Sequence, residues 1–381
     1  MKLAIAADWL PTYGGAEHVV AALSVLWPNA PIFTTIASVS SLPASLQRSD
    51  IRVSHLQTAY RLLGRHQWLL PWMPQTVEAM DFTGFDVILS SSHAVGKGFI
   101  PPGNSVHICY CHTPMRYAWE MEDEYLKDFR IRGLLKKRVR SELKRIRRWD
   151  LTTAKRVDHF IANSSETQAR IKRIYGRESV VIPPPVDACF YNFPLSAFRS
   201  PLPTRSYFLA IGRLVPYKRF DLLIHLANEL KLPLKIAGQG SEEARLKAIA
   251  GPTVEFLGYV SEENLPALYS NASALFFPQV EDAGIVPMEA QACGTPVIAL
   301  GQGGILDVVT EGATGILADA QTIESFMQAV KKFQATSWNH EAIRLHARAF
   351  HIDVFTQRMK EEIEKTYTRF APHVLPQDCH S

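Results

Sequence analysis

Hydrophobic residues occur along the chain as short continuous runs that alternate with longer amphipathic segments. The runs are five to seven residues long, and most contain β-branched or aromatic residues. Continuous rather than alternating hydrophobicity is typical of strands covered on both faces, as in parallel sheets. We therefore predict buried strands over residues 2–7, 85–91, 106–111, 159–164, 180–184, 207–212, 234–238, 254–258, 274–278 and 296–300.

The segments between these runs carry the pattern of helices. Apolar positions recur at helical spacing over residues 16–26 and 221–230. At two further helix starts, Ser241 and Ser261 precede acidic residues, so we expect each serine to be an N-cap. The regular alternation of strand and helix predicts a doubly wound α/β architecture.

This series of strands and helices occurs twice. The chain has 381 residues, which is more than one hydrophobic core usually supports. A proline-rich, weakly patterned segment near residues 190–205 separates the two halves. We predict one Rossmann-like domain over residues 1–190, a second over 191–355, and a final helix over 356–381 that packs back on the first. Two such domains would turn the carboxyl ends of their strands toward a central cleft, where ligands bind in this class.

The charge of the chain is concentrated in one block. The composition is that of an ordinary globular protein, with 47% apolar residues and a net charge of +4. Between Lys127 and Arg156, however, there are 13 Lys and Arg against 3 Asp and Glu. Such a block indicates an anionic partner, either a membrane surface or nucleic acid. We expect no nucleic acid, because the block lacks the stacking aromatics that single strands need.

The same block has apolar positions near one helical stripe, which leaves two interpretations open. As a basic amphipathic helix, residues 127–156 would lie on an anionic membrane surface. Alternatively, the stripe belongs to the core and the charges form its hydrated face. The stripe consists of Ile131, Leu134, Leu135, Val139, Leu143 and Ile146.

Cysteine spacing and hydropathy set the expected compartment. The five cysteines form no C-x-x-C pair, and no His/Cys set has zinc-finger spacing, so we expect neither a disulfide framework nor a structural metal. We also expect no cofactor. No run of about 18 apolar residues occurs, as a membrane span would require. Asp8 and Pro11 interrupt the first apolar run too early for a signal peptide. We expect a cytoplasmic protein, with peripheral association at the inner face of the cell membrane as a further option.

Two stretches of the first half carry candidate chemistry. Gly14 and Gly15 follow the first run and precede a helix, where backbone amides and the helix dipole can bind a phosphate. A tight strand–helix turn is the alternative. His112 comes directly after the run 106–111, at the end of a strand where doubly wound folds keep functional groups. A histidine there can donate a hydrogen bond or hold a developing charge, although single histidines are more often structural.

In the second half, cations and glycines follow the predicted strands. Arg213 and Lys218 lie one and six residues after the run 207–212, and two cations on one loop suit a diphosphate. The alternative is a solvated loop. Glycines at the next strand exits would leave room for a base or a ribose, and these are Gly238, Gly240 and Gly258.

The stretch "PQVEDAGIVPMEAQACGTPVIA" contains Glu281 and Glu289. We expect Glu281 on a strand-to-helix loop and Glu289 in the first turns of a helix that ends before Gly294. A carboxylate accepts hydrogen bonds from hydroxyl groups, so both glutamates suit the hydroxyls of a sugar or ribose. Helix N-termini bind anions through their backbone amides, here those of Gly284, Ile285 and Val286. The alternative for Glu289 is a stabilising interaction with its own helix N-terminus.

Together these motifs resemble the retaining glycosyltransferases of family 4, group 1. The resemblance runs from "DWLPTYGGAEHVV" through "YCHTPMRYAW", "FIANSSETQARIKRIYG", "VIPPPVD" and "AIGRLVPYKRFD" to "VEDAGIVPMEAQACGTPVIALGQGGILDVVTEGATGIL". Its most specific mark is the spacing of Glu281 and Glu289. The "YCHTPMRYAW" stretch is similar to bacterial mannosyltransferases of O-antigen and exopolysaccharide assembly. The resemblance implies the glycosyltransferase-B fold, with an acceptor-binding first domain and a nucleotide-sugar-binding second domain.

The resemblance also implies roles for individual residues. Catalytic groups would be His112, Arg213, Lys218 and Glu281. Donor-binding residues would be Gly14, Gly15, Arg213, Lys218, Gly238, Tyr259, Val260, Glu281, Ala283, Gly284, Ile285, Val286 and Glu289, with no metal. The sequence departs from the family pattern at Ala283, where an aromatic residue is usual, and at Asp307, where glutamate is common.

We therefore expect transfer of a sugar, with mannose from GDP-mannose favoured, to a lipid-linked or oligosaccharide acceptor in bacterial surface polysaccharide synthesis. An epimerase or phosphorylase of the same fold is an alternative, although no cofactor-binding lysine is evident and the Glu281–Glu289 loop argues against an epimerase. A non-catalytic membrane-associated scaffold is a third hypothesis, which the presence of Arg213, Lys218 and Glu281 disfavours.

Overall fold

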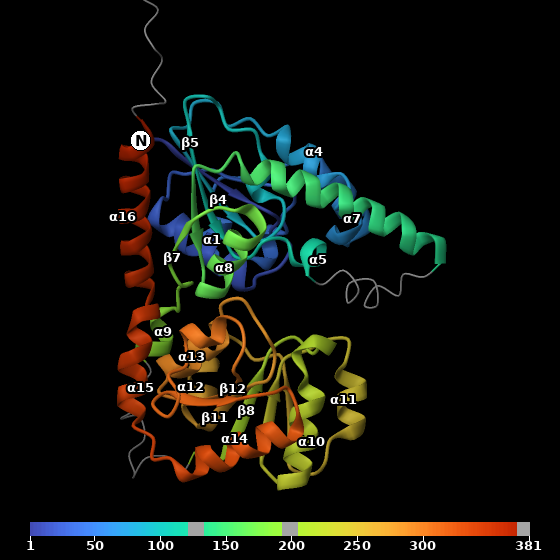
Figure 1. Ribbon diagram of the computed structural model, residues 1–381, viewed down its shortest axis with the longest axis vertical. Helices are drawn as coiled ribbons and strands as arrows, with labels where there is room; N and C mark the ends of the chain where they lie inside the picture. Colours follow the sequence, from blue (N-terminus) through green and yellow to red (C-terminus); the bar gives the residue numbers. More distant parts are fainter. Residues whose placement is uncertain (121–132, 193–204, 372–381) are drawn as a thin grey trace, which may run out of the picture. The chain divides into compact units, whose positions relative to one another are not determined.

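The computed structural model describes residues 1–120, 133–192 and 205–371. The chain divides into two compact units, which are labelled by element in Figure 1. Unit 1 comprises Met1–Pro184 together with Phe355–Ser381, and unit 2 comprises Pro185–Val354. Most of the proline-rich segment predicted near residues 190–205 lies outside the described residues.

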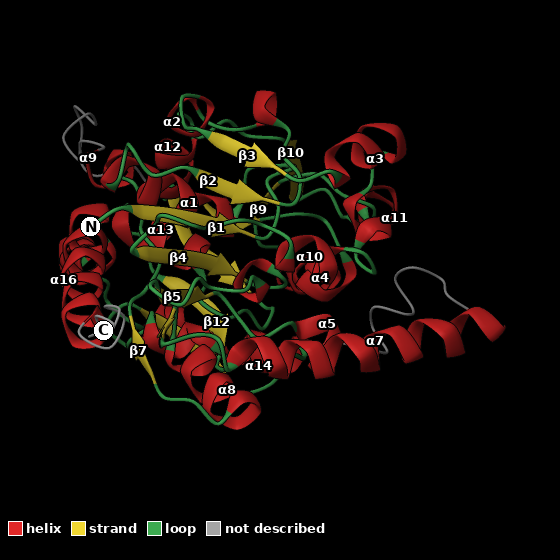
Figure 2. Cartoon of the chain, turned by 90° about the horizontal axis from the view of Figure 1, so that it is seen from above, coloured by secondary structure: helices red, strands yellow, loops and turns green. Residues whose placement is uncertain are grey.

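Unit 1 is built on a seven-stranded parallel sheet with the order β3-β2-β1-β4-β5-β6-β7 (Figure 2). The order reverses between β1 and β4, and ligands of doubly wound folds bind at the carboxyl ends of strands at such a switch point. The strands are β1 Leu3–Ala7, β2 Ile32–Thr34, β3 Ile51–Val53, β4 Val87–Ser92, β5 Val106–Cys111, β6 His159–Ala162 and β7 Ser179–Val181. Strands β1, β4 and β5 are buried along their whole length, as their continuous hydrophobicity predicts.

The helices of unit 1 lie around this sheet. They are α1 Gly15–Leu26, α2 Ala44–Gln47, α3 Leu56–Leu63, α4 Met73–Glu78, α5 Arg116–Trp119, α7 Gly133–Ala154, α8 Ser165–Tyr175 and α16 Ile352–Phe370. Helix α16 returns to this unit from the end of the chain. Its residues Phe355, Met359 and Ile363 are buried on one face, and Oε1 of Glu362 lies 2.9 Å from Nε2 of His159 on β6.

Unit 2 repeats the architecture with a six-stranded parallel sheet in the order β10-β9-β8-β11-β12-β13. Its switch point lies between β8 and β11. The strands are β8 Tyr207–Ile211, β9 Leu234–Ala237, β10 Val254–Gly258, β11 Ala272–Phe277, β12 Val297–Leu300 and β13 Gly315–Ala318. The helices are α9 Ala188–Asn192, α10 Phe220–Leu230, α11 Glu243–Ile249, α12 Leu265–Ser270, α13 Ile285–Ala292, α14 Ile323–Ala335 and α15 His340–Ala347. The predicted doubly wound fold is thus confirmed in both units.

Three strands were not predicted, and two helix starts were predicted wrongly. Strands β2 and β3 have only three residues each, and β13 begins with a glycine, so none has a long hydrophobic run. Helices α11 and α12 start after Glu242 and Asn264, and neither residue caps its helix with a side-chain hydrogen bond. Ser261 instead hydrogen-bonds Asn264 in the preceding turn, at 2.9 Å between Oγ and Nδ2.

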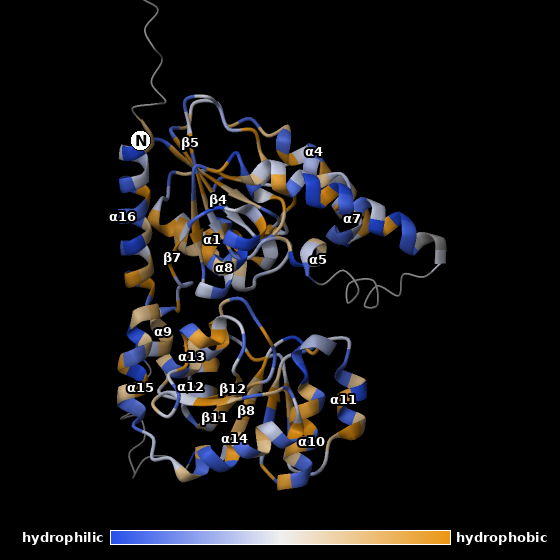
Figure 3. Ribbon diagram, viewed as in Figure 1, coloured by the Kyte–Doolittle hydropathy of each residue, from blue (hydrophilic) through white to orange (hydrophobic). Residues whose placement is uncertain are grey.

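Helix α7 contains most of the basic block, and Figure 3 shows it mainly in the hydrophilic colour. Its apolar residues Leu143 and Ile146 are buried in unit 1, and Val139 is half-buried. In this part of the helix the stripe therefore belongs to the core, which supports the second of the two interpretations. Ile131 lies outside the described residues. No helix in the described part of the chain combines the length and apolar character that a membrane span needs.

Candidate functional site

In unit 1, a buried aspartate organises the carboxyl ends of β1 and β4. Asp8 directly follows β1 and accepts hydrogen bonds from the backbone amides of His93, Ala94 and Gly96. Its Oδ2 also lies 2.8 Å from Nδ1 of His93. Burial alone would raise the pKa of Asp8, but His93 and these amides hold it well below its usual range. The loop after β4 is therefore fixed around a permanent negative charge.

His112 lies directly after β5, as predicted. Its Nε2 is 2.8 Å from Oγ of Ser91 on β4, and its ring lies 6.2 Å from the ring of His93. Burial, and then the charge of His93, lower the pKa of His112 to about 3. The imidazole is therefore uncharged near pH 7, and it can donate or accept a hydrogen bond in that neutral form.

The Gly14-Gly15 turn also matches its prediction, because α1 begins at Gly15 with Gly14 as N-cap. Glu17 in the first turn is buried, and burial raises its pKa. A cavity of about 10 Å³, about the size of one water molecule, is lined by Asp8, Glu17, Ser91 and His93, among others. Asp8 and His93 were not predicted as site residues, although each follows a predicted strand as His112 does.

In unit 2, the structure brings Lys218 and Glu281 together across the switch point. Lys218 ends a 3₁₀ turn, Pro216–Lys218, after β8, and Glu281 follows β11. Lys218 Nζ lies 2.9 Å from Glu281 Oε1, which also accepts a 3.2 Å bond from Nε2 of Gln279. Burial alone would lower the pKa of Lys218, but the Glu281 carboxylate outweighs it and the pKa is raised. The lysine is therefore a fixed positive charge.

Arg213 lies on the same loop but is exposed. Within the described part of the chain it forms no ion pair, although it lies close enough to Lys218 for its charge to lower that lysine's pKa. Gly212 before it has a φ of 150°, which few other residues adopt. A Cβ at Gly212 would lie 2.8 Å from Lys218 Nζ, so this glycine also makes room for the lysine.

Two of the later glycines are required by the neighbouring backbone. A Cβ at Gly238 would lie 1.9 Å from the carbonyl oxygen of Gly212, and one at Gly240 would lie 2.3 Å from that of Leu214. These two positions therefore need glycine whether or not a ligand binds there. Gly258 has open space where a Cβ would be, and Tyr259 after it is exposed while Val260 is half-buried.

The backbone of Glu281 is held by the loop after β12, which was not predicted to belong to the site. Gly303, after β12, forms a parallel bridge with Glu281, and the amide of Gly304 donates a 2.9 Å hydrogen bond to its carbonyl. A Cβ at Gly304 would lie 1.9 Å from the carbonyl oxygen of Asp282. The "GQGG" turn therefore fixes the position of the Glu281 loop, and its paired glycines were the available signal.

Glu289 lies on α13, as predicted, but has different partners from Glu281. It is buried, and its Oε2 accepts a 2.7 Å hydrogen bond from the hydroxyl of Tyr269. Burial raises the pKa of Glu289 to about 8, although the Tyr269 hydrogen bond opposes this shift. The two glutamates are thus not an interacting acid–base pair. Tyr269 was not predicted, because it lies on another helix.

Between the two glutamates, α13 starts at Ile285 with Gly284 as N-cap, at a φ of 73°. The first amides of a helix have no intrahelical acceptor, so those of Ile285 and Val286 can bind an anion. Ala283 is buried beside them. In unit 2, then, the end of the sheet offers two cations, a half-buried carboxylate and a helix N-terminus, which suits a ligand with phosphate and hydroxyl groups.

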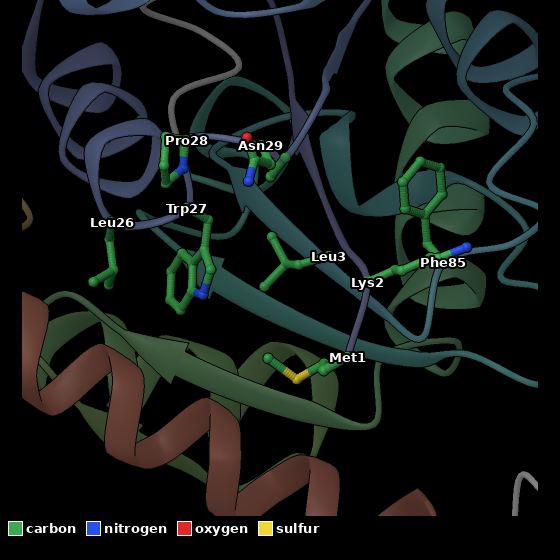
Figure 4. Close-up of a pocket in the computed structure, with 9 residues that line it drawn as sticks. Met1, Lys2, Leu3, Leu26, Trp27, Pro28, Asn29 and Phe85 are labelled. Carbon is green, nitrogen blue, oxygen red and sulfur yellow. The ribbon is translucent and has the colours of Figure 1, made fainter.

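A pocket of about 390 Å³ in unit 1 involves none of the predicted residues (Figure 4). It is lined by the start of β1 and the end of α1, with Leu3 and Trp27 among its residues. It therefore lies at the amino end of β1, away from the strand ends that carry Asp8 and His112.

Comparisons with known proteins identify the family and the fold of the chain. The family model "Glycosyltransferase Family 4" matches residues 13–190, and "Glycosyl transferases group 1" matches residues 195–349. The structure of HepE from Anabaena in complex with UDP-glucose aligns with a TM-score of 0.69 and 19% identity, covering 96% of this chain and 100% of that chain. At this identity the likeness shows the fold, which is that of the glycosyltransferase-B structures.

Two curated relatives match over part of their length. The D-inositol 3-phosphate glycosyltransferase of Rhodococcus opacus (strain B4) is 28% identical over 204 residues, or 46% of this chain and 45% of that protein. The GDP-mannose-dependent alpha-(1-6)-phosphatidylinositol monomannoside mannosyltransferase of Mycolicibacterium smegmatis is 30% identical over 174 residues, or 41% of this chain and 46% of that protein. The chain thus spans less than half the length of each relative. With family models matching both halves and the fold of both units agreeing, the chain belongs to the group 1, family 4 glycosyltransferases.

Proposed function

We propose that the protein is a retaining glycosyltransferase that moves mannose from GDP-mannose to a lipid-linked or saccharide acceptor in bacterial surface polysaccharide synthesis. The observation that carries this proposal is the contact between buried Lys218 and half-buried Glu281 next to Arg213, at the switch point of unit 2. Ligands of doubly wound folds bind at this place.

The proposed chemistry follows from the charges that develop during transfer. Breaking the bond between a sugar and a diphosphate leaves negative charge on the diphosphate and positive charge on the sugar. Fixed cations near the leaving group stabilise that state more than the ground state, so they raise the rate. Lys218 is held as a buried cation, and Arg213 adds a planar guanidinium that matches phosphate oxygens. The amides at the start of α13 add further donors for the phosphates.

The two glutamates would hold hydroxyl groups rather than transfer protons. Glu281 is already an acceptor for Lys218 and Gln279, and its remaining oxygen would accept hydroxyls of the transferred sugar. Glu289 would accept the ribose hydroxyls, and Tyr269 orients its carboxyl group. In unit 1, the neutral imidazole of His112 would contact the sugar near the reacting centre.

The choice of donor rests on the relatives. The Mycolicibacterium smegmatis protein is named as GDP-mannose-dependent, and its sequence identity to this chain is higher than that of HepE, which was crystallised with UDP-glucose. The "YCHTPMRYAW" stretch also favours mannose. A GDP-sugar is therefore the proposed donor, and a UDP-sugar is the alternative to test.

We place the protein in the cytoplasm at the inner face of the cell membrane. The cations of α7, of which Lys137 and Arg138 are exposed, support this placement, because each basic residue near an anionic surface adds to the attraction. Neutralising four of them should reduce sedimentation with anionic vesicles, and unchanged sedimentation would leave α7 as an ordinary hydrated face. The four are Lys136, Lys137, Arg138 and Arg140.

A thermal-shift screen with GDP-mannose, UDP-glucose and ADP-glucose tests the donor. A ligand that binds only the folded protein raises its melting temperature, so GDP-mannose should give the largest shift. The shift should disappear in Lys218→Ala. NMR of the product then identifies the anomer, and an inverted product would refute retention. Equal shifts for all three sugars, or none, would refute the donor assignment.

A further inference from the structure

Unit 1 exposes four large hydrophobic side chains within a short stretch of sequence. Leu62 and Leu63, at the end of α3, are 83% and 54% exposed. Trp68, in the 3₁₀ turn His66–Leu69, is 62% exposed, and Trp72 is 55% exposed. Scattered exposed leucines are ordinary, but a group containing two tryptophans indicates an interaction surface.

The backbone that carries these side chains is anchored in the core. Leu56, Leu69, Leu70 and Met73 belong to the same stretch and are buried in the hydrophobic core of unit 1. The buried residues therefore fix residues 61–72, which we call the docking segment, and leave the other side chains facing outward. Figure 2 shows α3 and the projecting helix α7 both on the right of the view.

The docking segment carries positive charge beside its exposed apolar side chains. It contains Arg61 and Arg65 and no Asp or Glu, whereas the nearby Arg52 is paired with Asp50 at 2.8 Å. The docking segment also contacts α7 directly, because Arg145 donates a 2.9 Å hydrogen bond to the carbonyl oxygen of Pro71. Exposed hydrophobic residues and the cations of α7 thus form one surface.

Neither α7 nor the docking segment alone has both the charge and the apolar side chains that stable attachment to a membrane requires. The apolar residues Leu143 and Ile146 of α7 point into the core, so the described part of this helix presents mainly charge to solvent. Charge gives attraction to anionic lipid headgroups, whereas stable attachment also requires apolar side chains that enter the boundary with the acyl chains. The docking segment has such residues, and tryptophan is the side chain enriched at this depth of a membrane.

We propose that the docking segment and α7 together bind an anionic phospholipid bilayer, with Leu62, Leu63, Trp68 and Trp72 inserted and the cations of α7 on the lipid phosphates. The use of this surface rests on the proposed function, since a lipid-linked acceptor resides in such a bilayer. The surface lies next to the candidate site. The ring of His66 contacts that of Trp9 at 4.9 Å between centroids, and Trp9 follows Asp8 at the end of β1.

Co-flotation of the full chain with phosphatidylglycerol-containing vesicles tests the insertion. Leu62→Ser/Leu63→Ser should weaken the vesicle affinity by about tenfold or more, because two large apolar side chains no longer leave water. The matched control is Val25→Ser/Leu345→Ser, which changes two residues of 64% and 65% exposure elsewhere, and it should bind as the wild type does. Pure phosphatidylcholine vesicles should bind the wild type weakly.

Quenching by lipids with brominated acyl chains supplies a second measurement. The wild type should lose tryptophan fluorescence on these vesicles, and Trp68→Phe/Trp72→Phe should remove most of that loss, whereas Trp27→Phe should not. Equal affinity of the leucine variant and its control, or quenching that survives the tryptophan variant, would overturn the proposal. A wild type that does not float with anionic vesicles would also overturn it.

A second copy of the chain is the competing occupant of this surface. Light scattering would then show a dimer without lipid that Leu62→Ser/Leu63→Ser dissociates, and that result would overturn the proposal. The donor thermal shift separates this test from the proposed function. If vesicle binding is absent but GDP-mannose still raises the melting temperature, only the membrane surface is refuted. If vesicle binding is present but GDP-mannose does not raise the melting temperature, only the transferase assignment is refuted.

Discussion

Replacing Glu289 by glutamine should change how the stability of the protein depends on pH. Burial raises the pKa of this carboxyl group to about 8 from an ordinary value of 4.5. Between these two values the folded state keeps a proton that the unfolded state releases, so stability falls as pH rises. From pH 6 to pH 8 the wild type should lose about 2 kcal/mol of unfolding free energy through this group, at about 1.4 kcal/mol per pH unit until the folded pKa is reached.

Glutamine is neutral at every pH and can still accept the hydrogen bond from Tyr269. Glu289→Gln should therefore match the wild type near pH 5 and become relatively more stable toward pH 8. Urea unfolding at several pH values measures this as the difference between variant and wild type, which cancels the contributions of other groups. Burial lowers the pKa of His107 and of His112 to about 3, so those two contribute stability that is lost as pH falls. Glu263→Gln, an exposed carboxylate before α12, is the control. A difference that is constant with pH would refute the argument.

Two further predictions concern unit 2. Lys218→Ala and Glu281→Ala should each slow sugar transfer by more than about tenfold, because each removes a preorganised group at the proposed leaving group or sugar. Circular dichroism should confirm that each variant is folded. An unchanged rate of transfer would exclude the substituted residue from the site. Gly304→Ala should destabilise the protein strongly, since its Cβ would lie 1.9 Å from a carbonyl oxygen of the backbone. Gly258 has a φ of 65°, but no atom lies within 4 Å of the position of a new Cβ. Gly258→Ala should therefore lower the unfolding free energy by only about 1–2 kcal/mol. Equal melting temperatures for the two glycine variants would contradict the steric argument.

The sequence predicted the parts of the fold that depend on local hydrophobicity. Strands β1, β4 and β5 are buried along their whole length, and the hydrophobic run of β1 and the Val-Ile-Leu start of β4 reflect this burial on both faces of the sheet. Strand β3 is a half-exposed edge strand of three residues, and only its pairing with β2 defines it. The prediction of serine N-caps was wrong because the turns before α11 and α12 continue beyond Ser241 and Ser261, so each helix begins later in the sequence.

Positions in the candidate site were predictable, but their partners were not. Strand exits placed His112, Lys218 and Glu281 correctly because the rule concerns only the adjacent strand. The contact of Lys218 with Glu281 depends on β8 and β11 being neighbours in the sheet. The contact of Asp8 with His93 spans 85 residues and depends on β1 pairing with β4. The pairing of strands sets such contacts, and no local pattern encodes it.

The route of the chain has a consequence for synthesis on the ribosome. Unit 2 is one continuous stretch, Pro185–Val354, and its two ends are joined by a bridge between Val186 and His351. Unit 1 requires α16, which follows unit 2 in the sequence. Because domains form as units during synthesis, unit 2 can fold before the chain is complete. The contacts of Phe355 with Tyr110 of β5 and of Glu362 with His159 of β6 cannot form until α16 has been synthesised, so unit 1 acquires its last packing contacts after the whole of unit 2 has been made.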